Sequence, residues 1–267
     1  MLETQILHNR HLLFSLVTRD IKLKYAGSSL GVFWSVVQPL ILLILYIIVF
    51  STLMGTTRIL LKNNEVNYAV FLCPCLLAWN WFTESVSSSC YSIISGAPLI
   101  RRVAFPTGIL PCVPVLSGFL PFVVVLIIFF LYQGIFTPTF RPIELLLVLL
   151  VICIQFFLTI GLCFFVSALN VVIRDTAQVT MALLQILFWA TPIVYMEDIL
   201  VKQFSYAATW FMINPFAHLM KIWREAIGAH CLPNWQSTAI LLLWAIIFYI
   251  AGRYLFTKSS DSFIEQV

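Results

Sequence analysis

Charged residues are scarce in this chain of 267 residues. They make up 10% of it, whereas hydrophobic residues make up 61%. Soluble domains typically carry about 25% charged and about 45–50% apolar residues. The imbalance excludes an ordinary soluble protein and indicates a polytopic membrane protein. We interpret the net charge of +4 as a signal of membrane topology, and we expect no nucleic-acid partner.

Motifs for catalysis and nucleotide binding are missing as well. The sequence contains no GxxxxGK[ST] phosphate-binding loop, no nucleophile elbow and no constellation of metal ligands. It also has no long polar segment that could fold as an ATPase. We therefore expect a protein that is not an enzyme and binds no cofactor itself. If ATP drives its activity, a separate polypeptide has to bind the ATP and its magnesium ion.

A disulfide framework and a cleavable signal peptide are also not expected. The seven cysteines lie mostly inside apolar runs, which is typical of small packing residues. Met1–Asp20 lacks the compact apolar stretch and the small-residue cleavage site of a secretory signal.

Long apolar runs are what the sequence has in abundance. A helix needs about 20 mostly apolar residues to cross the hydrocarbon core of a bilayer. Six runs qualify: Val32–Met54, Val66–Ser95, Leu110–Tyr132, Ile143–Asn170, Ala177–Tyr195 and Ala239–Phe256. The sequence predicts an all-α fold with six transmembrane helices between residues 32 and 256, in one transmembrane domain over residues 1–267.

Two further apolar stretches, between the fifth and sixth runs, are too short to span. They are Ile199–Ile213 and Phe216–Ile227, and Asn214-Pro215 separates them. The second stretch repeats an apolar residue every four positions and keeps its charged residues off that line. The pattern predicts two short amphipathic helices, which lie either at an interface or as a re-entrant pair.

The N-terminal segment combines charges with an apolar face directly before the first run. On a helix, one broad face would carry Leu13, Phe14, Leu16, Val17 and Ile21, and the charged residues would leave it. Such a helix is typical of the headgroup layer, where cations meet anionic lipids. We predict an interfacial helix within residues 1–30.

Six spans place both termini on one side of the membrane. The loops on that side carry nine Lys and Arg residues and the opposite loops carry six. Because cytoplasmic loops are enriched in positive charge, we predict that both termini, including the tail 257–267, are cytoplasmic.

Four blocks of sequence carry a resemblance to a known family. They are RDIKLKYAGSSLGVFWSVVQPL (19–40), APLIRRVAFPTGILP (97–111), LNVVIRDTAQVTMALLQILFWATPIVY (169–195) and NPFAHLMKIWREAIG (214–228). Together they resemble the membrane subunit of ABC-type polysaccharide exporters, the export permeases for O-antigen, capsule and teichoic acid. The resemblance implies a homodimer in the bacterial inner membrane, with two ABC ATPase subunits docked below. A lipid-linked polysaccharide, with O-antigen preferred, would pass between the two subunits.

The resemblance also implies that cytoplasmic segments contact the ATPase. The candidate coupling residues are Arg19, Asp20, Lys22, Pro98, Leu99, Ile100, Arg101, Arg102, Phe105, Arg174 and Asp175. Two alternatives stay open. The loop arginines can serve only as topology signals that contact lipid phosphates, and Arg174 and Asp175 can form a local ion pair or a helix cap.

A passage for a long glycan should be lined by aromatic and neutral polar groups, because fixed charges would bind the chain too tightly. The candidates are Tyr25, Trp34, Gln38, Tyr46, Gln185, Phe188, Trp189 and Tyr195. Each aromatic residue can alternatively face lipid or pack between helices.

Glu84 is the only acid well inside an expected span. It could contact sugar hydroxyls. The preferred interpretation is a buried carboxyl group that is hydrogen-bonded to a neighbouring helix.

Three other functions stay open on the sequence. An ion-coupled secondary transporter would need buried ionisable residues and usually an internal repeat, and only Glu84 is a candidate. A glycan- or lipid-modifying enzyme would need clustered acids or histidines, and Glu197-Asp198 is the only such pair. The third is an ABC exporter of another cargo, such as capsule, teichoic acid, a lipid or a drug.

Overall fold

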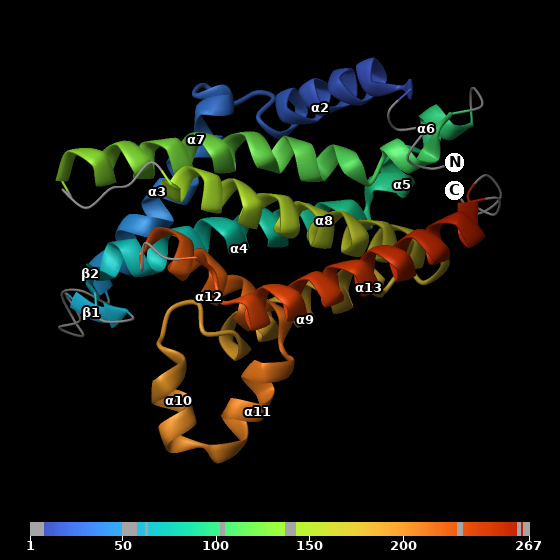
Figure 1. The fold of residues 1–267 in the computed structure, drawn as a ribbon. Coiled ribbons are helices and arrows are strands. Elements are labelled where there is room, and N and C mark those ends of the chain that lie inside the picture. The colour runs from blue at the N-terminus through green and yellow to red at the C-terminus, as the bar shows by residue number, and fades with distance from the viewer. Residues whose placement is uncertain are drawn as a thin grey trace.

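The computed structural model describes residues 8–49, 58–61, 64–101, 105–136, 143–228, 232–260 and 263. Figure 1 shows a bundle of long helices with shorter elements at its ends and on one side. In chain order the elements are α2 (Arg10–Lys24), η1 (Gly31–Phe33), α3 (Trp34–Ile47), β1 (Arg58–Leu61), β2 (Asn64–Asn67), α4 (Tyr68–Cys90), α5 (Ser92–Ser95), α6 (Ala97–Ile100), η3 (Thr107–Ile109), α7 (Cys112–Phe136), α8 (Ile143–Val172), α9 (Thr176–Ala190), α10 (Glu197–Gln203), α11 (Ser205–Ile213), α12 (Pro215–Ile227) and α13 (Trp235–Ser259).

Four helical segments of the described residues are long and apolar enough to cross a membrane. They are Tyr68–Cys90, Thr107–Ile135, Ile143–Val172 and Trp235–Ser259, and they coincide with the second, third, fourth and sixth expected spans. Gly31–Ile47 and Thr176–Ala190 are shorter apolar helices at the first and fifth positions. A helical, multi-pass membrane protein is therefore confirmed, while the count of six spans stays a prediction. The antiparallel hairpin β1–β2 is an unexpected addition.

Helix α4 occupies the middle of the bundle, where it packs against α3, α7, α8, α9 and α12. It is the least apolar of the four long helices and the most buried of them. Its serine and threonine hydroxyls bond to backbone carbonyls, as Ser85 does to Trp81 O at 2.7 Å. Polar groups in a membrane helix usually face protein. This explains why the most polar helix is central and the more apolar helices surround it.

Helix α2 packs against α7 with part of the apolar face that the sequence predicts. Leu13 and Val17 are buried, whereas Phe14 is 63% exposed. Only part of the predicted apolar face therefore packs against protein, and Phe14 lies on the part that is left uncovered.

The region between α9 and α13 contains three helices instead of the two that were expected. The first predicted stretch divides at Phe204, whose extended backbone (φ −135°, ψ 111°) separates α10 from α11. Figure 1 shows these two helices projecting from the side of the bundle. The second stretch forms α12, where the Asn214 side chain accepts a hydrogen bond from Phe216 N and Pro215 occupies the first turn.

Helices α8 and α13 approach each other most closely at two glycines. A Cβ atom on Gly161 would lie 2.6 Å from Tyr249 N, and one on Gly252 would meet the Gly161 carbonyl oxygen. Small residues allow membrane helices to approach so closely that their backbones touch. This contact fixes α13 against α8.

Replacing Gly252 by alanine should push α8 and α13 apart, because the added methyl group meets backbone that cannot move aside. We expect a loss of stability of about 1–3 kcal/mol, measured as a lower apparent melting temperature of the purified protein in detergent. Gly134→Ala is the matched control, since a Cβ atom there meets nothing within 4 Å. Equal melting temperatures for Gly252→Ala and the parent protein would show that this contact does not hold the helices.

Candidate transport groove and its supporting contacts

Two adjoining cavities lie between α3 with the connection that precedes it, α4 and α7. The larger has a volume of about 450 Å³, and its polar lining consists of Tyr25, Ser35, Gln38, Asn80 and Glu84. The smaller has a volume of about 360 Å³ and is lined mainly by apolar residues: Ile21, Val32, Phe33, Val36, Leu120, Pro121 and Val124. We call the two cavities together the transport groove. It contains three of the predicted channel residues, Tyr25, Gln38 and Glu84.

Helix α4 presents Asn80 and Glu84 to the groove because they lie one helical turn apart. The position of α4 against α7 is fixed by Trp81, whose Nε1 donates to Val115 O at 3.0 Å. The Trp81 ring also lies 5.0 Å from the Phe122 ring, centroid to centroid. The wall of the groove is therefore held by both hydrogen bonding and aromatic packing.

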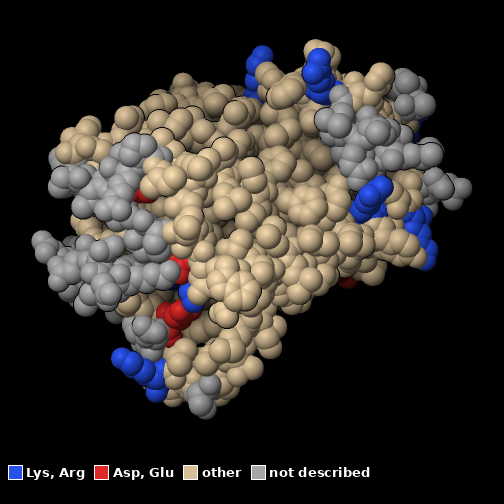
Figure 2. All heavy atoms as spheres, viewed as in Figure 1, with Lys and Arg blue, Asp and Glu red and all other residues tan. Residues whose placement is uncertain are grey.

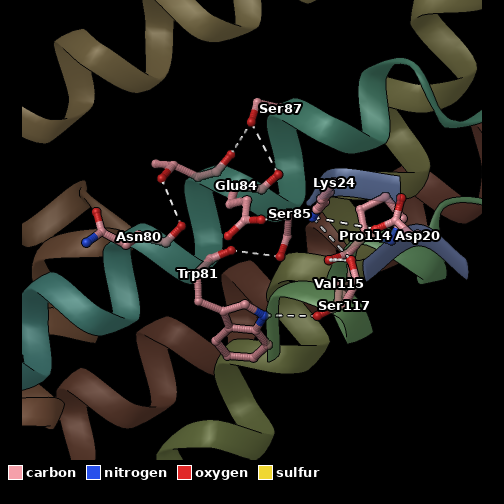
Figure 3. Close-up of polar contacts among 11 residues, drawn as sticks. Asp20, Lys24, Asn80, Trp81, Glu84, Ser85, Ser87, Pro114, Val115 and Ser117 are labelled. Carbon is pink, nitrogen blue, oxygen red and sulfur yellow. Dashed lines mark hydrogen bonds and ion pairs between the residues drawn. The ribbon is translucent and has the colours of Figure 1, made fainter. Parts of the chain in front are cut away.

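An ion pair crosses the groove from the end of α2 to the middle of α4. Lys24 Nζ lies 2.8 Å from Glu84 Oε1, 3.5 Å from Asp20 Oδ2 and 3.4 Å from Ser117 Oγ. Figure 3 shows Lys24 pointing toward Glu84 and Ser117. The Glu84 side chain is 44% exposed, so the prediction of a buried carboxyl group is wrong. Its partner lies at the end of the N-terminal helix, sixty residues away in sequence.

The surroundings of the pair keep its lysine charged. Burial lowers the pKa of Lys24, but the carboxylates of Glu84 and Asp20 together raise it more, so that the pKa ends above the ordinary 10.5. Burial also raises the pKa of the neighbouring Tyr25, and the charge of Glu84 adds to this rise. At neutral pH the Tyr25 hydroxyl is therefore protonated and can donate a hydrogen bond into the groove.

The other predicted channel residues lie outside the lining of the groove. Trp34 is 39% exposed. Tyr46 and Phe188 contact each other with ring centroids 6.5 Å apart, and the Phe188 ring also packs against buried Trp79. On α9, Gln185 is exposed and Trp189 is 60% exposed. A role for these residues in transport stays a prediction.

The chain between α9 and α10 leaves helical geometry among buried residues, and its carbonyl groups need new donors. Side chains from other elements supply them. Trp210 Nε1 donates to Ala190 O at 2.8 Å, and Tyr68 OH donates to Val194 O at 2.9 Å. Tyr195, a predicted channel residue, donates its hydroxyl to Trp189 O at 2.7 Å. In the structure the Tyr195 hydroxyl therefore hydrogen-bonds to the C-terminal end of the preceding helix, α9.

Arg224 is the centre of this carbonyl-binding arrangement. Its Nη2 donates to Pro192 O at 2.6 Å and to Ile193 O at 2.9 Å. The guanidinium carbon lies 3.8 Å from the centroid of the Phe71 ring, a cation–π contact. The sequence pattern placed Arg224 on a polar face of an amphipathic helix, but the residue is only 7% exposed. One sequence signal could have revealed its role. A charged residue inside a membrane segment usually faces protein or water and has a specific partner there.

The predicted coupling residues divide into exposed and inward-facing groups. Arg19, Lys22, Pro98, Arg101, Arg174 and Asp175 are exposed. Leu99 is half-buried, Asp20 pairs with Lys24, and Ile100 and Phe105 pack against a core formed partly by α2 and α7. Ile100 and Phe105 therefore pack within this chain, and their contact with the ATPase stays a prediction. Arg102 lies outside the described residues.

The turn after α8 carries two of the exposed coupling residues. Asp175 occupies the N-cap position of α9 but makes no side-chain capping hydrogen bond, and no ion pair joins it to Arg174 in the described part of the chain. The two structural alternatives for this pair are thus not realised here. Helices α5 and α6 lie with both chain termini at one end of the bundle (Figure 1). Figure 2 shows Lys and Arg gathered over α2 and that end, while the middle of the same face is uncharged.

The structure is a multi-pass helical bundle with a groove at the C-terminal end of its N-terminal helix α2. Residues 11–227 match the family model of the ABC-2 type transporter. The chain belongs to this family, and it is a transport protein and not an enzyme. Membrane subunits of this family work together with an ABC ATPase.

Two similar proteins align with nearly the whole chain. The O-antigen export system permease protein RfbA of Klebsiella pneumoniae is 30% identical over 256 residues, which are 95% of this chain and 94% of the relative. The protein of the same name from Myxococcus xanthus is 28% identical over 97% of this chain and 96% of its own length. The family match over residues 11–227 includes the residues of the groove, α9 and α12.

Replacing Arg224 by methionine should destabilise the protein strongly, because the carbonyl oxygens of Pro192 and Ile193 would be left buried without donors. We expect a loss of about 2–5 kcal/mol, seen as a melting temperature lowered by roughly 5–15 °C in detergent. Lys221→Met, on the same helix but half-buried, is the matched control and should change stability by about 0.5 kcal/mol or less. An unchanged melting temperature for the Arg224 variant would mean that its hydrogen bonds contribute nothing.

Proposed function

We propose that this chain is the membrane subunit of an ATP-driven exporter of a lipid-linked polysaccharide, O-antigen. It lies in the bacterial inner membrane with six spans and both termini in the cytoplasm. Two copies associate with two copies of an ABC ATPase, and the polysaccharide passes between the two membrane subunits. The alternative within the same class is another cargo, such as capsule or teichoic acid.

The observation that carries this proposal is the similarity to export permeases along the whole chain. The alignment with the Klebsiella protein leaves out only about one residue in twenty of either chain, so no domain of the relative is missing. The name of that relative assigns it to O-antigen export. This favours O-antigen over the other cargoes.

A separate motor follows from the motifs of the chain. The sequence has no phosphate-binding loop, so hydrolysis of ATP has to take place on a partner. The exposed basic residues Arg19, Lys22, Arg101 and Arg174 lie on segments that the family resemblance assigns to ATPase contact. Their charge suits an acidic rim on that partner.

The groove supports the choice of a neutral, hydroxyl-rich cargo. Its polar end offers hydroxyl, amide and carboxylate groups from Tyr25, Ser35, Gln38, Asn80 and Glu84, which can exchange hydrogen bonds with sugar hydroxyls. The single lysine at the groove is offset by two carboxylates, so that no excess positive charge would hold a chain in place.

The outer faces of α3 and α9 support a partner copy or lipid at these positions. On α3, Trp34 and Ile44 are 39% and 54% exposed, and on α9, Ile186 and Trp189 are 63% and 60% exposed. An apolar surface of this kind needs cover by lipid or protein. In a dimer these faces would lie between the two copies.

Reconstitution tests the proposal directly. The chain, its ATPase and a lipid-linked O-antigen are placed in proteoliposomes. Transfer of glycan across the membrane is followed with a lectin that is added to one side and binds glycan only there. We expect transfer that requires ATP and stops when the phosphate-loop lysine of the ATPase is replaced. Transfer without any ATPase, driven by an ion gradient, would contradict the proposal, as would transfer of lipids or drugs but of no glycan.

A further inference from the structure

The two cavities of the transport groove adjoin along a shared wall. Both are lined by Tyr25, Ser35, Glu84 and Pro121. Tyr25 directly follows Lys24, and Glu84 is the ion-pair partner of Lys24. The C-terminal end of α2 is therefore followed directly by a residue of this wall, Tyr25, and carries the charge, on Lys24, that binds α2 to α4.

The connection from α2 to α3 contains two glycines. Gly27 and Gly31 adopt positive φ angles of 81° and 52°, which suit glycine and strain other residues. A Cβ atom on either glycine would meet nothing within 4 Å, so no neighbouring side chain or backbone blocks a change of direction at these two positions. The connection can serve as a hinge when α2 moves relative to α3.

Two kinds of contact hold α2 in its present position. Leu13 and Val17 pack on apolar neighbours, and such contacts have no direction and tolerate small displacements. The contact from Lys24 Nζ to Glu84 Oε1 at 2.8 Å is directional and is lost within a small displacement. The ion pair therefore discriminates between two positions of α2.

We propose that the Lys24–Glu84 ion pair is a latch that closes the transport groove, and that displacement of α2 by the ATPase opens it. When the latch is closed, Tyr25 and Glu84 keep the two cavities apart. When α2 swings about Gly27 and Gly31, Lys24 and Tyr25 leave together and the two cavities join. The joined groove then opens beside α3, whose outer face would lie between the two copies. The carboxylate of Glu84 is then free to accept hydrogen bonds from sugar hydroxyls. This role in regulation rests on the proposed function.

The test measures opening without any need for glycan. Ser117 lies 3.4 Å from Lys24 Nζ and is 3% exposed, so a cysteine at this position reports whether Lys24 has left. The full chain carrying Ser117→Cys, assembled with its ATPase in proteoliposomes, is treated with a water-soluble methanethiosulfonate. Mass spectrometry follows modification at position 117, which separates it from the native cysteines.

We expect slow modification in the Ser117→Cys chain and modification about tenfold faster when Lys24→Met is added, a factor that corresponds to about 1.4 kcal/mol. Trapping the ATPase with ATP and vanadate should produce a similar increase while Lys24 is present. Exchanging the charges by Lys24→Glu together with Glu84→Lys should restore slow modification, whereas Lys24→Glu alone should not, because it adds a third carboxylate beside Asp20 and Glu84.

The matched control is Arg10→Met, which also removes a positive charge from α2 but lies at its other end. It should leave the rate of modification unchanged. A Lys24→Met rate within twofold of the parent rate, or no rescue by the charge exchange in a chain that folds normally, would overturn the latch. If modification follows the latch as expected but no glycan is transferred, the latch stands and the proposed function fails.

Discussion

Backbone carbonyl groups within a membrane protein need hydrogen-bond donors, and this requirement shapes the part of the structure where helices break. Each unsatisfied group in hydrocarbon costs several kcal/mol. After α9 ends at Ala190, donors from Tyr68, Trp210 and Arg224 reach the carbonyls that the helix no longer serves. The reach of these side chains from α4, α11 and α12 allows the chain to turn among buried residues, and it places α12 inside the bundle.

The same requirement explains the arrangement around the groove. Serine and threonine hydroxyls on α4 bond to carbonyls of the preceding turn, as Ser87 does to Thr83 O at 2.6 Å. Asn80 and Glu84 then remain available to the groove and to Lys24. A central helix with moderate polarity can thus line a groove while its serine and threonine hydroxyls stay hydrogen-bonded.

The long elements could be predicted from the sequence because their signal is local. Apolar runs marked the four long helices, and Asn214-Pro215 marked the start of α12. The predictions failed for the burial of polar side chains and for contacts between residues far apart in the sequence. Arg224 lies off the apolar line of its helix, and no pattern within α12 reveals that protein covers that side too. The partner of Glu84 comes from sixty residues away, where periodicity in one helix carries no information.

The close contact between Gly161 and Gly252 also has a dynamic consequence. Backbones that touch without intervening side chains cannot slide past each other without a clash, so α8 and α13 behave as one rigid strut. Conformational change in the membrane subunit would then have to leave this pair intact and move other helices relative to it. Helix α2, which packs on α7 and does not belong to this pair, is free of that constraint.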